Sequence, residues 1–313
     1  MARRNIITVI STGGTISMVD KGAGAVPTLH GGDLLKSVPS DLEGLEIQVE
    51  HFSAIPSSFM TLEQLWNLQK TVSDRLDRLY VRGVVVTCGT DTMEEIAYLL
   101  DYTIPVDKAV VVTGAMRTAS DEGYEGKHNL WSAIRVALEP EADKRGTMIV
   151  MNDEIHAARY VTKTMSHNVA TFQSPGWGPM GHLFGTKVIW GWQLERDQLP
   201  VRAITPDVHL ISLTVGADET LLRHLIDKRV RGIVIEAFGS GRVPPWWCPL
   251  IEEAIQKGIM IVIASRMISG YTHDNYGFKG AHRELEKMGV IFAEGLSARK
   301  ARIRLMCALG AVR

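Results

Sequence analysis

The chain alternates short β-branched apolar runs with segments of helical periodicity, and this alternation limits its fold more than any other feature. Thr92 and Glu95 stand in capping-box register and predict a helix over residues 92–100. Apolar residues at helical spacing predict another over 62–79. Apolar runs predict buried parallel strands at residues 6–11, 82–88, 108–113 and 147–152. Strands and helices that alternate in this way are typical of an α/β fold.

The same alternation returns in the second half of the chain after an interruption. Residues 185–207 are polar and contain tryptophan but have no clear helical period, so we interpret a domain connection there. Beyond it the pattern predicts strands at 209–215, 232–237 and 259–265, and helices at 219–229, 249–256 and from 297.

A chain of 313 residues is longer than one core usually serves, so we expect two domains. The larger, N-terminal domain is expected to hold a parallel or mixed sheet with flanking helices, and the C-terminal domain to be a smaller α/β unit. The expected limits are residues 1–190 for the first domain, 191–208 for a linker and 209–313 for the second.

Charge, length of apolar runs and cysteine count narrow the class of protein. Thirty-four basic against thirty-five acidic residues leave a net charge of -1, without the basic excess that attracts nucleic acid. No run approaches the length of a membrane span, and the first residues lack the apolar region and cleavage site of a signal peptide. Three cysteines far apart in sequence, Cys88, Cys248 and Cys307, fit a reducing compartment. We expect a cytoplasmic protein whose partners include neither nucleic acid nor a membrane.

Motifs for metals and nucleotides are missing from the sequence. The ten histidines show no zinc-site spacing, and there is no Walker A segment. Gly239-Ser240-Gly241 lacks the third glycine of a dinucleotide fingerprint. We therefore expect no metal and no cofactor.

Hydroxyl-bearing residues follow directly after two of the expected strands, where ligands of open parallel sheets bind. Thr15 comes after Gly13 and Gly14, which allow a sharp turn that holds a hydroxyl out of the sheet. It is a candidate nucleophile, the alternative being a glycine turn whose hydroxyl bonds locally. Thr90 and Asp91 precede a helix start that Thr92 alone could cap, so they are free for another role.

Together with Lys163, which by itself would be interpreted as a surface lysine, these segments resemble the bacterial-type L-asparaginase family. Its two signatures, TGGTI and GTDTMEE, occur at residues 12–16 and 89–95. The similarity continues through residues 113–117, 151–153, 161–164, 169–172, 178–179, 276–278 and 300–302. The resemblance implies an enzyme that converts L-asparagine to L-aspartate and ammonia through an acyl-enzyme.

The resemblance also implies catalytic roles. Thr15 would be the nucleophile and Thr12 a structural residue, while Thr90 would face the substrate amide with Asp91 and Lys163 behind it. Neither signature contains a histidine. A lysine whose pKa is lowered by burial could then act as the base that activates a weakly nucleophilic hydroxyl.

Substrate recognition follows from the same resemblance. Asp91 and the helix-start amides around Gly89 and Thr90 would recognise the α-ammonium and α-carboxylate groups of the substrate. Ser57 or Ser58 falls where the family places a serine that binds the α-carboxylate. Alignment on the nearby methionine, residue 60, favours Ser57.

The sequence departs from the family at three places. The expected lid, residues 17–32, has no tyrosine to offer the nucleophile, because the first tyrosine of the chain is Tyr80. The loop Gly239–Pro244 carries Arg242 where an asparagine is common, and a surface ion pair is the alternative role for this arginine. Asp274 only loosely matches an acidic residue that precedes Tyr-Gly-Phe in some members.

In well-known members the loop that corresponds to Gly239–Pro244 reaches a neighbouring subunit's site. The resemblance therefore implies a homo-oligomer, either a dimer or a tetramer. Three functions remain as alternatives to an asparaginase. They are a glutaminase-asparaginase, an ammonia-donating amidotransferase subunit, which usually carries an N-terminal extension, and a non-catalytic protein that binds a small ligand. Thr15, Thr90, Asp91 and Lys163 together argue against a mere binding protein.

Overall fold

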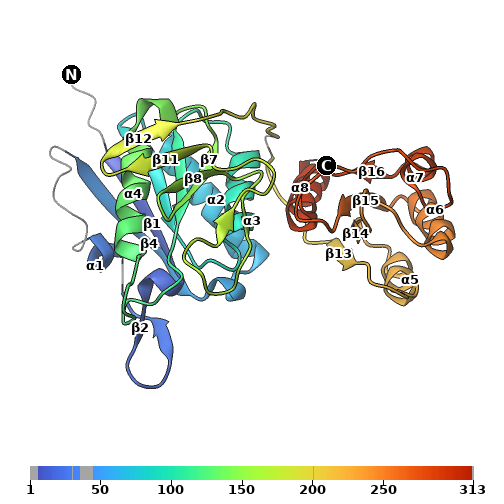
Figure 1. The fold of residues 1–313 in the computed structure, drawn as a ribbon, viewed down its shortest axis with the longest axis horizontal. Coiled ribbons are helices and arrows are strands. Elements are labelled where there is room, and N and C mark those ends of the chain that lie inside the picture. Colours follow the sequence, from blue (N-terminus) through green and yellow to red (C-terminus); the bar gives the residue numbers. More distant parts are fainter. Residues whose placement is uncertain (1–5, 30, 36–44, 200, 312–313) are drawn as a thin grey trace. The chain divides into compact units, whose positions relative to one another are not determined.

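The computed structural model describes residues 6–29, 31–35, 45–199 and 201–311. Contacts divide the chain into two compact units, Met1–Gln198 and Leu199–Arg313, each with its own sheet (Figure 1). The expected α/β class is confirmed, with a larger mixed sheet in the first unit and a smaller sheet in the second. The expected domain limits and the linker at 191–208 stay predictions.

The first unit is built on an eight-stranded sheet in the order β12-β11-β8-β7-β6-β5-β1-β4. Its parallel part consists of β1 (Ile6–Gly13), β4 (Glu46–Ile55), β5 (Val81–Thr87), β6 (Ala109–Thr113) and β7 (Thr147–Met151). Three antiparallel strands extend it: β8 (Glu154–Ala157), β11 (Gly181–Phe184) and β12 (Lys187–Trp190). The carboxyl ends of β1 and β5 lie side by side, because the two strands are paired in parallel.

Helices cover both faces of this sheet. Figure 1 shows α4 (Gly126–Leu138) on one side, and α2 (Leu62–Leu76) and α3 (Met93–Thr103) on the other. Successive residues of a strand face opposite sides, so alternate residues of the central strands pack beneath α4. That core includes Ile7, Val9, Val85, Val111, Met148, Leu130 and Ile134.

Shorter elements complete the first unit. They are the helix α1 (Gly31–Leu35), the 3-10 turns η1 (Thr15–Ser17), η2 (Ser57–Phe59) and η3 (Pro140–Ala142), and two hairpins formed by β2 (Met18–Asp20) with β3 (Ala25–Pro27) and by β9 (Thr162–Lys163) with β10 (Phe172–Gln173). The β7–β8 hairpin turns at Asn152 and Asp153, whose φ angles of 53 and 60° are those that a two-residue type I′ turn requires.

The second unit contains a parallel four-stranded sheet in the order β13-β14-β15-β16. Its elements are β13 (Val208–Ser212), α5 (Thr220–Asp227), β14 (Gly232–Ala237), η4 (Pro245–Trp247), α6 (Cys248–Gln256), β15 (Met260–Ser265), α7 (His282–Met288), β16 (Ile291–Phe292) and α8 (Ala298–Ala311). Isoleucines of the three longer strands form the centre of its core. Among the described residues of both units, no helix has the length and apolar character of a membrane span.

The helix start after Asp91 is correct, but the predicted capping box is wrong. Thr92 is the N-cap of α3 and makes no side-chain bond to the helix. Its hydroxyl instead donates to the carbonyl oxygen of Ser57 at 3.2 Å. Thr92 therefore ties the start of α3 to η2, a long-range contact that the local sequence does not reveal.

The interpretation of residues 185–207 as a connection is wrong at its beginning. Residues 187–190 form β12, which pairs with β11 at the edge of the main sheet. Its residues, Lys-Val-Ile-Trp, alternate between exposed and half-buried positions, as is usual for a strand with one exposed face.

Candidate active site

Two glycines bring three segments into contact at the carboxyl ends of β1 and β5. Gly14 has a φ of 81°, and a Cβ atom there would lie 2.2 Å from the backbone nitrogen of Gly89. A Cβ atom on Gly89 would in turn lie 2.6 Å from Ser57 Oγ. Any side chain at either position would separate the TGGT turn, the β5–α3 junction and η2. These glycines therefore allow one continuous site.

A pocket of about 180 Å³ opens where the three segments meet. All but one of the candidate site residues predicted from the sequence line this pocket, namely Thr15, Ser57, Gly89, Thr90, Asp91 and Lys163. Ser58 does not line it and is exposed. Of the two serines considered for the carboxylate, the structure thus brings only Ser57 to the pocket.

Lys163 contacts both side chains of the β5–α3 junction. Its Nζ donates to Thr90 Oγ1 at 2.8 Å and to Asp91 Oδ1 at 2.7 Å. The Lys163 side chain is 18% exposed, whereas that of Asp91 is 65% exposed. Lys163 therefore lines the pocket with its amine on the hydroxyl of Thr90, while Asp91 remains accessible to a ligand.

Ser57 is buried beside the same junction. Its Oγ accepts a hydrogen bond from the backbone N–H of Asp91 at 3.2 Å. Since that bond uses the oxygen as an acceptor, the hydroxyl hydrogen can be donated to a bound carboxylate.

The two threonines of the TGGT turn have different surroundings. Thr12 is buried, and its hydroxyl donates to the carbonyl oxygen of Thr87 at 3.1 Å, which links β1 to β5. Thr15 is half-buried at the start of η1 and lines the pocket. Of the two, only Thr15 is available to a substrate.

A tyrosine that the sequence did not single out supports the turn that carries Thr15. Tyr124 Oη donates to the carbonyl oxygen of Ile16 at 2.6 Å. Burial raises the pKa of Tyr124 above its usual value, with a smaller contribution from the neighbouring Glu125. The phenol thus stays protonated and able to donate. Its partner is a backbone atom, so it does not take the place of the missing lid tyrosine at the nucleophile.

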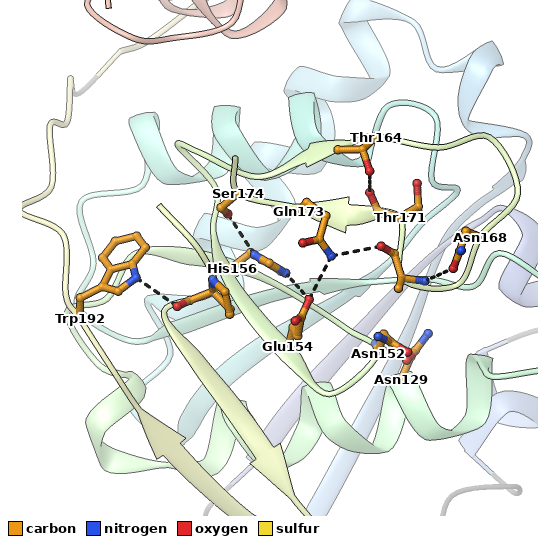
Figure 2. A network of polar contacts seen from close by, with 12 residues as sticks. Asn129, Asn152, Glu154, His156, Thr164, Asn168, Thr171, Gln173, Ser174 and Trp192 are labelled. Carbon is orange, nitrogen blue, oxygen red and sulfur yellow. Dashed lines mark hydrogen bonds and ion pairs between the residues drawn. The ribbon is translucent and has the colours of Figure 1, made fainter. Parts of the chain in front are cut away.

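Lys163 belongs to the β9–β10 hairpin, which a polar network fastens to β8 (Figure 2). His156, fully buried, contacts Ser174 Oγ through Nδ1 at 3.0 Å and Glu154 Oε2 through Nε2 at 3.2 Å. Gln173 also donates to Glu154, at 3.3 Å. The hydrogen bond from His156 lowers the pKa of Glu154, so a charged carboxylate accepts from Nε2–H. The hairpin is thereby held against the sheet.

Four further side chains of the pocket were not expected from the sequence: Met18, Pro56, Met116 and Ser166. Met116 follows β6 and so occupies the same end of the sheet as Thr15 and Thr90, a signal that could have indicated it. Ser166 lies in the loop between β9 and β10. Its place depends on how the hairpin folds onto α3, which the sequence pattern does not show.

The two residues of the second unit that depart from the family have local partners. Arg242 lies over the ring of Tyr276, with Cζ 4.6 Å from the ring centroid, and has no ion pair within residues 201–311. Asp274 Oδ2 pairs with Arg283 at 2.8 Å. In neither unit do the described residues include a group of three or more His, Cys, Asp or Glu that could hold a metal.

Comparison with known families decides the class of protein. A model of the N-terminal asparaginase domain matches residues 6–196, and a model of the glutaminase/asparaginase C-terminal domain matches residues 207–313. The chain belongs to the bacterial-type asparaginase family. The resemblance noted in the sequence is thereby confirmed, and the protein is a hydrolase that acts on amides.

Individual relatives agree over almost the whole chain. An L-asparaginase of Bacillus licheniformis is 33% identical over 96% of this chain and 94% of its own. A glutaminase-asparaginase of Pseudomonas fluorescens is 28% identical over 97% of this chain and 86% of its own. The crystal structure of a probable cytoplasmic L-asparaginase from Campylobacter jejuni superposes with a TM-score of 0.88 at 31% identity, covering 97% of this chain and 95% of that one.

Proposed function

We propose that this protein hydrolyses L-asparagine to L-aspartate and ammonia through an acyl-enzyme on Thr15. The observation that supports this most is the position of Lys163, whose amine contacts Thr90 and Asp91 in the pocket that Thr15 lines. The amine of Lys163 thus contacts the hydroxyl of Thr90, and Thr15, which carries the second hydroxyl, lines the same pocket.

The reaction takes two steps. Thr15 Oγ1 attacks the side-chain amide carbon, and its proton passes through an ordered water to Thr90, which gives its own proton to the neutral amine of Lys163. The ammonium group formed in this way then protonates the departing nitrogen. The C–N bond breaks, ammonia leaves and an ester remains on Thr15. Water then attacks the ester and returns a proton to Thr15. Because the base contacts Thr90 directly, Thr90 shares in both proton transfers.

The remaining groups bind the amino-acid end of the substrate. Asp91 uses Oδ1 for Lys163, which leaves Oδ2 for the substrate α-ammonium. Ser57 and the amides around Gly89 and Thr90 donate to the α-carboxylate, in part from the start of α3. This arrangement suits a free amino acid.

A substrate comparison tests this function. We expect kcat/KM for ammonia release to be highest on L-asparagine when L-asparagine, D-asparagine and L-glutamine are compared. A preference for L-glutamine would favour the glutaminase-asparaginase alternative, and ammonia released only in the presence of an acceptor protein would favour an amidotransferase subunit. Binding without any release would indicate a small-ligand binding protein.

We also propose a ligand-gated lid at residues 17–32, of which residue 30 lies outside the described residues. Part of this segment is the β2–β3 hairpin, which projects from the unit (Figure 1), and its Met18 lines the pocket. Lys21 lies exposed at the tip. Acyl transfer to Thr15 needs bulk water excluded, a task that lids commonly perform.

Limited proteolysis tests the lid. We expect trypsin to cleave after Lys21 in the free enzyme and saturating L-aspartate to slow this cleavage. A Lys21→Gln variant, which lacks the site, identifies the fragment. Equal cleavage rates with and without L-aspartate, at a concentration that inhibits turnover, would contradict a ligand-gated lid.

We further propose a cytoplasmic homo-oligomer, a dimer or tetramer, in which the loop Gly239–Pro244 completes a neighbour's site. Its supports are the family resemblance and the buried free thiols of Cys88, Cys248 and Cys307. The relatives differ in their named location. A 32% identical Haemophilus influenzae protein is named a probable periplasmic L-asparaginase, whereas the 31% identical Campylobacter jejuni protein is named a probable cytoplasmic one.

Dilution should then lower the specific activity in step with dissociation. Light scattering at the assay concentration provides the matching measurement of mass. A fully active monomer would contradict the shared site.

A further inference from the structure

Glu94 holds the backbone of Lys163. Its Oε2 accepts a hydrogen bond from the Lys163 backbone N–H at 3.1 Å. Glu94 is 3% exposed and lies in the first turn of α3, three residues after Asp91, which contacts the Lys163 amine. The nearly buried side chain of Glu94 thus accepts a hydrogen bond from the main chain of Lys163, the proposed base.

The geometry of the β9–β10 hairpin explains why this N–H needs a partner outside the hairpin. Lys163 is paired with Phe172, and the next backbone N–H, that of Thr164, donates to Thr171 O at 2.8 Å. Successive N–H groups of a strand point to opposite sides. The Lys163 N–H therefore points away from β10 and toward α3, where Glu94 accepts it.

Both the side chain and the backbone of Lys163 are consequently held by one short segment, residues 90–94. Thr90 and Asp91 fix the amine, and Glu94, three residues later, fixes the backbone. We propose that Glu94 is a positioning residue that sets the Lys163 amine against Thr90. The role rests on the proposed function, which makes Lys163 the base.

The rest of the hairpin has a separate anchorage. Ser174 and Gln173, at the far end of β10, are held to β8 by His156 and Glu154 (Figure 2). Without the Glu94 contact the hairpin keeps that attachment but loses its link to α3 at Lys163. We therefore expect loss of the acceptor to displace Lys163 without unfolding the unit.

Two variants of similar size distinguish the effect of the hydrogen-bond acceptor from the effect of side-chain volume. Glu94→Leu removes the acceptor, and Glu94→Gln keeps a carbonyl oxygen that can accept from the same N–H. We expect Glu94→Leu to lower kcat by about ten- to a hundredfold, as a displaced catalytic group does. The KM for L-asparagine should change by less than about threefold, because Glu94 does not line the pocket. Glu94→Gln should retain kcat within about fivefold.

Crystal structures of both variants supply a readout that does not need activity. We expect the distance between Lys163 Nζ and Thr90 Oγ1 to lengthen in Glu94→Leu and to stay near 2.8 Å in Glu94→Gln. If the leucine variant does not fold, Glu94→Ala makes the same comparison without added bulk.

A folded Glu94→Leu variant with wild-type kcat and an unmoved Lys163 would overturn the positioning role, as would equal losses of kcat in both variants. If the wild type releases no ammonia from L-asparagine or L-glutamine, the proposed function fails. The measured displacement of Lys163 still decides the role of Glu94 in that case.

Discussion

Thr15→Ala is expected to lower kcat on L-asparagine by at least about a hundredfold, as removal of a nucleophile does. Thr15 lines the pocket, whereas the hydroxyl of Thr12 is engaged with the carbonyl oxygen of Thr87. No second hydroxyl of the TGGT turn can therefore replace it. Ammonia release under saturating substrate measures the loss, and circular dichroism shows whether the variant has folded.

Thr12→Ser is the matched control, because serine keeps a hydroxyl that can donate to the Thr87 carbonyl. It should cost little turnover. Wild-type turnover in a folded Thr15→Ala variant would show that the nucleophile lies elsewhere.

Lys163→Met should lower kcat by a similar factor. Methionine keeps the length of the side chain but removes the amine that contacts Thr90 and Asp91. The proton of the attacking hydroxyl then has no base, and general acid–base groups contribute about a hundredfold or more. Thr90→Val, which keeps the shape of threonine, removes the other partner of this contact and should lose at least about a hundredfold.

Lys127→Met is the control for loss of a positive charge, since Lys127 is an exposed residue of α4 in the same unit. It should leave kcat unchanged. If Lys163→Met and Lys127→Met both retained wild-type kcat, Lys163 would not be the base. Combining Lys163→Met with Thr90→Val should cost little more than either change alone, because the two residues act as a pair.

The parallel core of the fold was predictable because its strands carry short apolar runs rich in β-branched residues. The strands β5, β6, β7 and β14 are buried along most of their length, and each carries three or four consecutive apolar residues, many of them β-branched. Edge strands lack that signal. In β4 the charged residues Glu46 and Glu50 are tolerated because much of this strand is exposed, and no strand was predicted there. Helix α4 was not expected either, since its first turn holds the poor helix formers Gly126, His128 and Asn129.

The candidate site was predictable where a glycine turn or a helix start places polar residues at a strand end, as with Thr15, Thr90 and Asp91. The contacts of Lys163 were not, because Lys163 lies 72 residues from Asp91 in sequence and approaches it through the fold of the β9–β10 hairpin. The contact of Glu94 with Lys163 could not be predicted for a related reason. In sequence it is an acidic residue in the first turn of a helix, a position that the helix dipole alone explains.

Rapid acid quenching of L-asparagine turnover, followed by peptide mapping, tests the acyl-enzyme most directly. We expect one aspartyl group on the peptide that contains Thr15 and none in the Thr15→Ala variant. Added hydroxylamine should intercept the same ester and yield aspartyl hydroxamate. An aspartyl group on Thr90 would contradict the account, as would turnover that gives neither adduct nor hydroxamate.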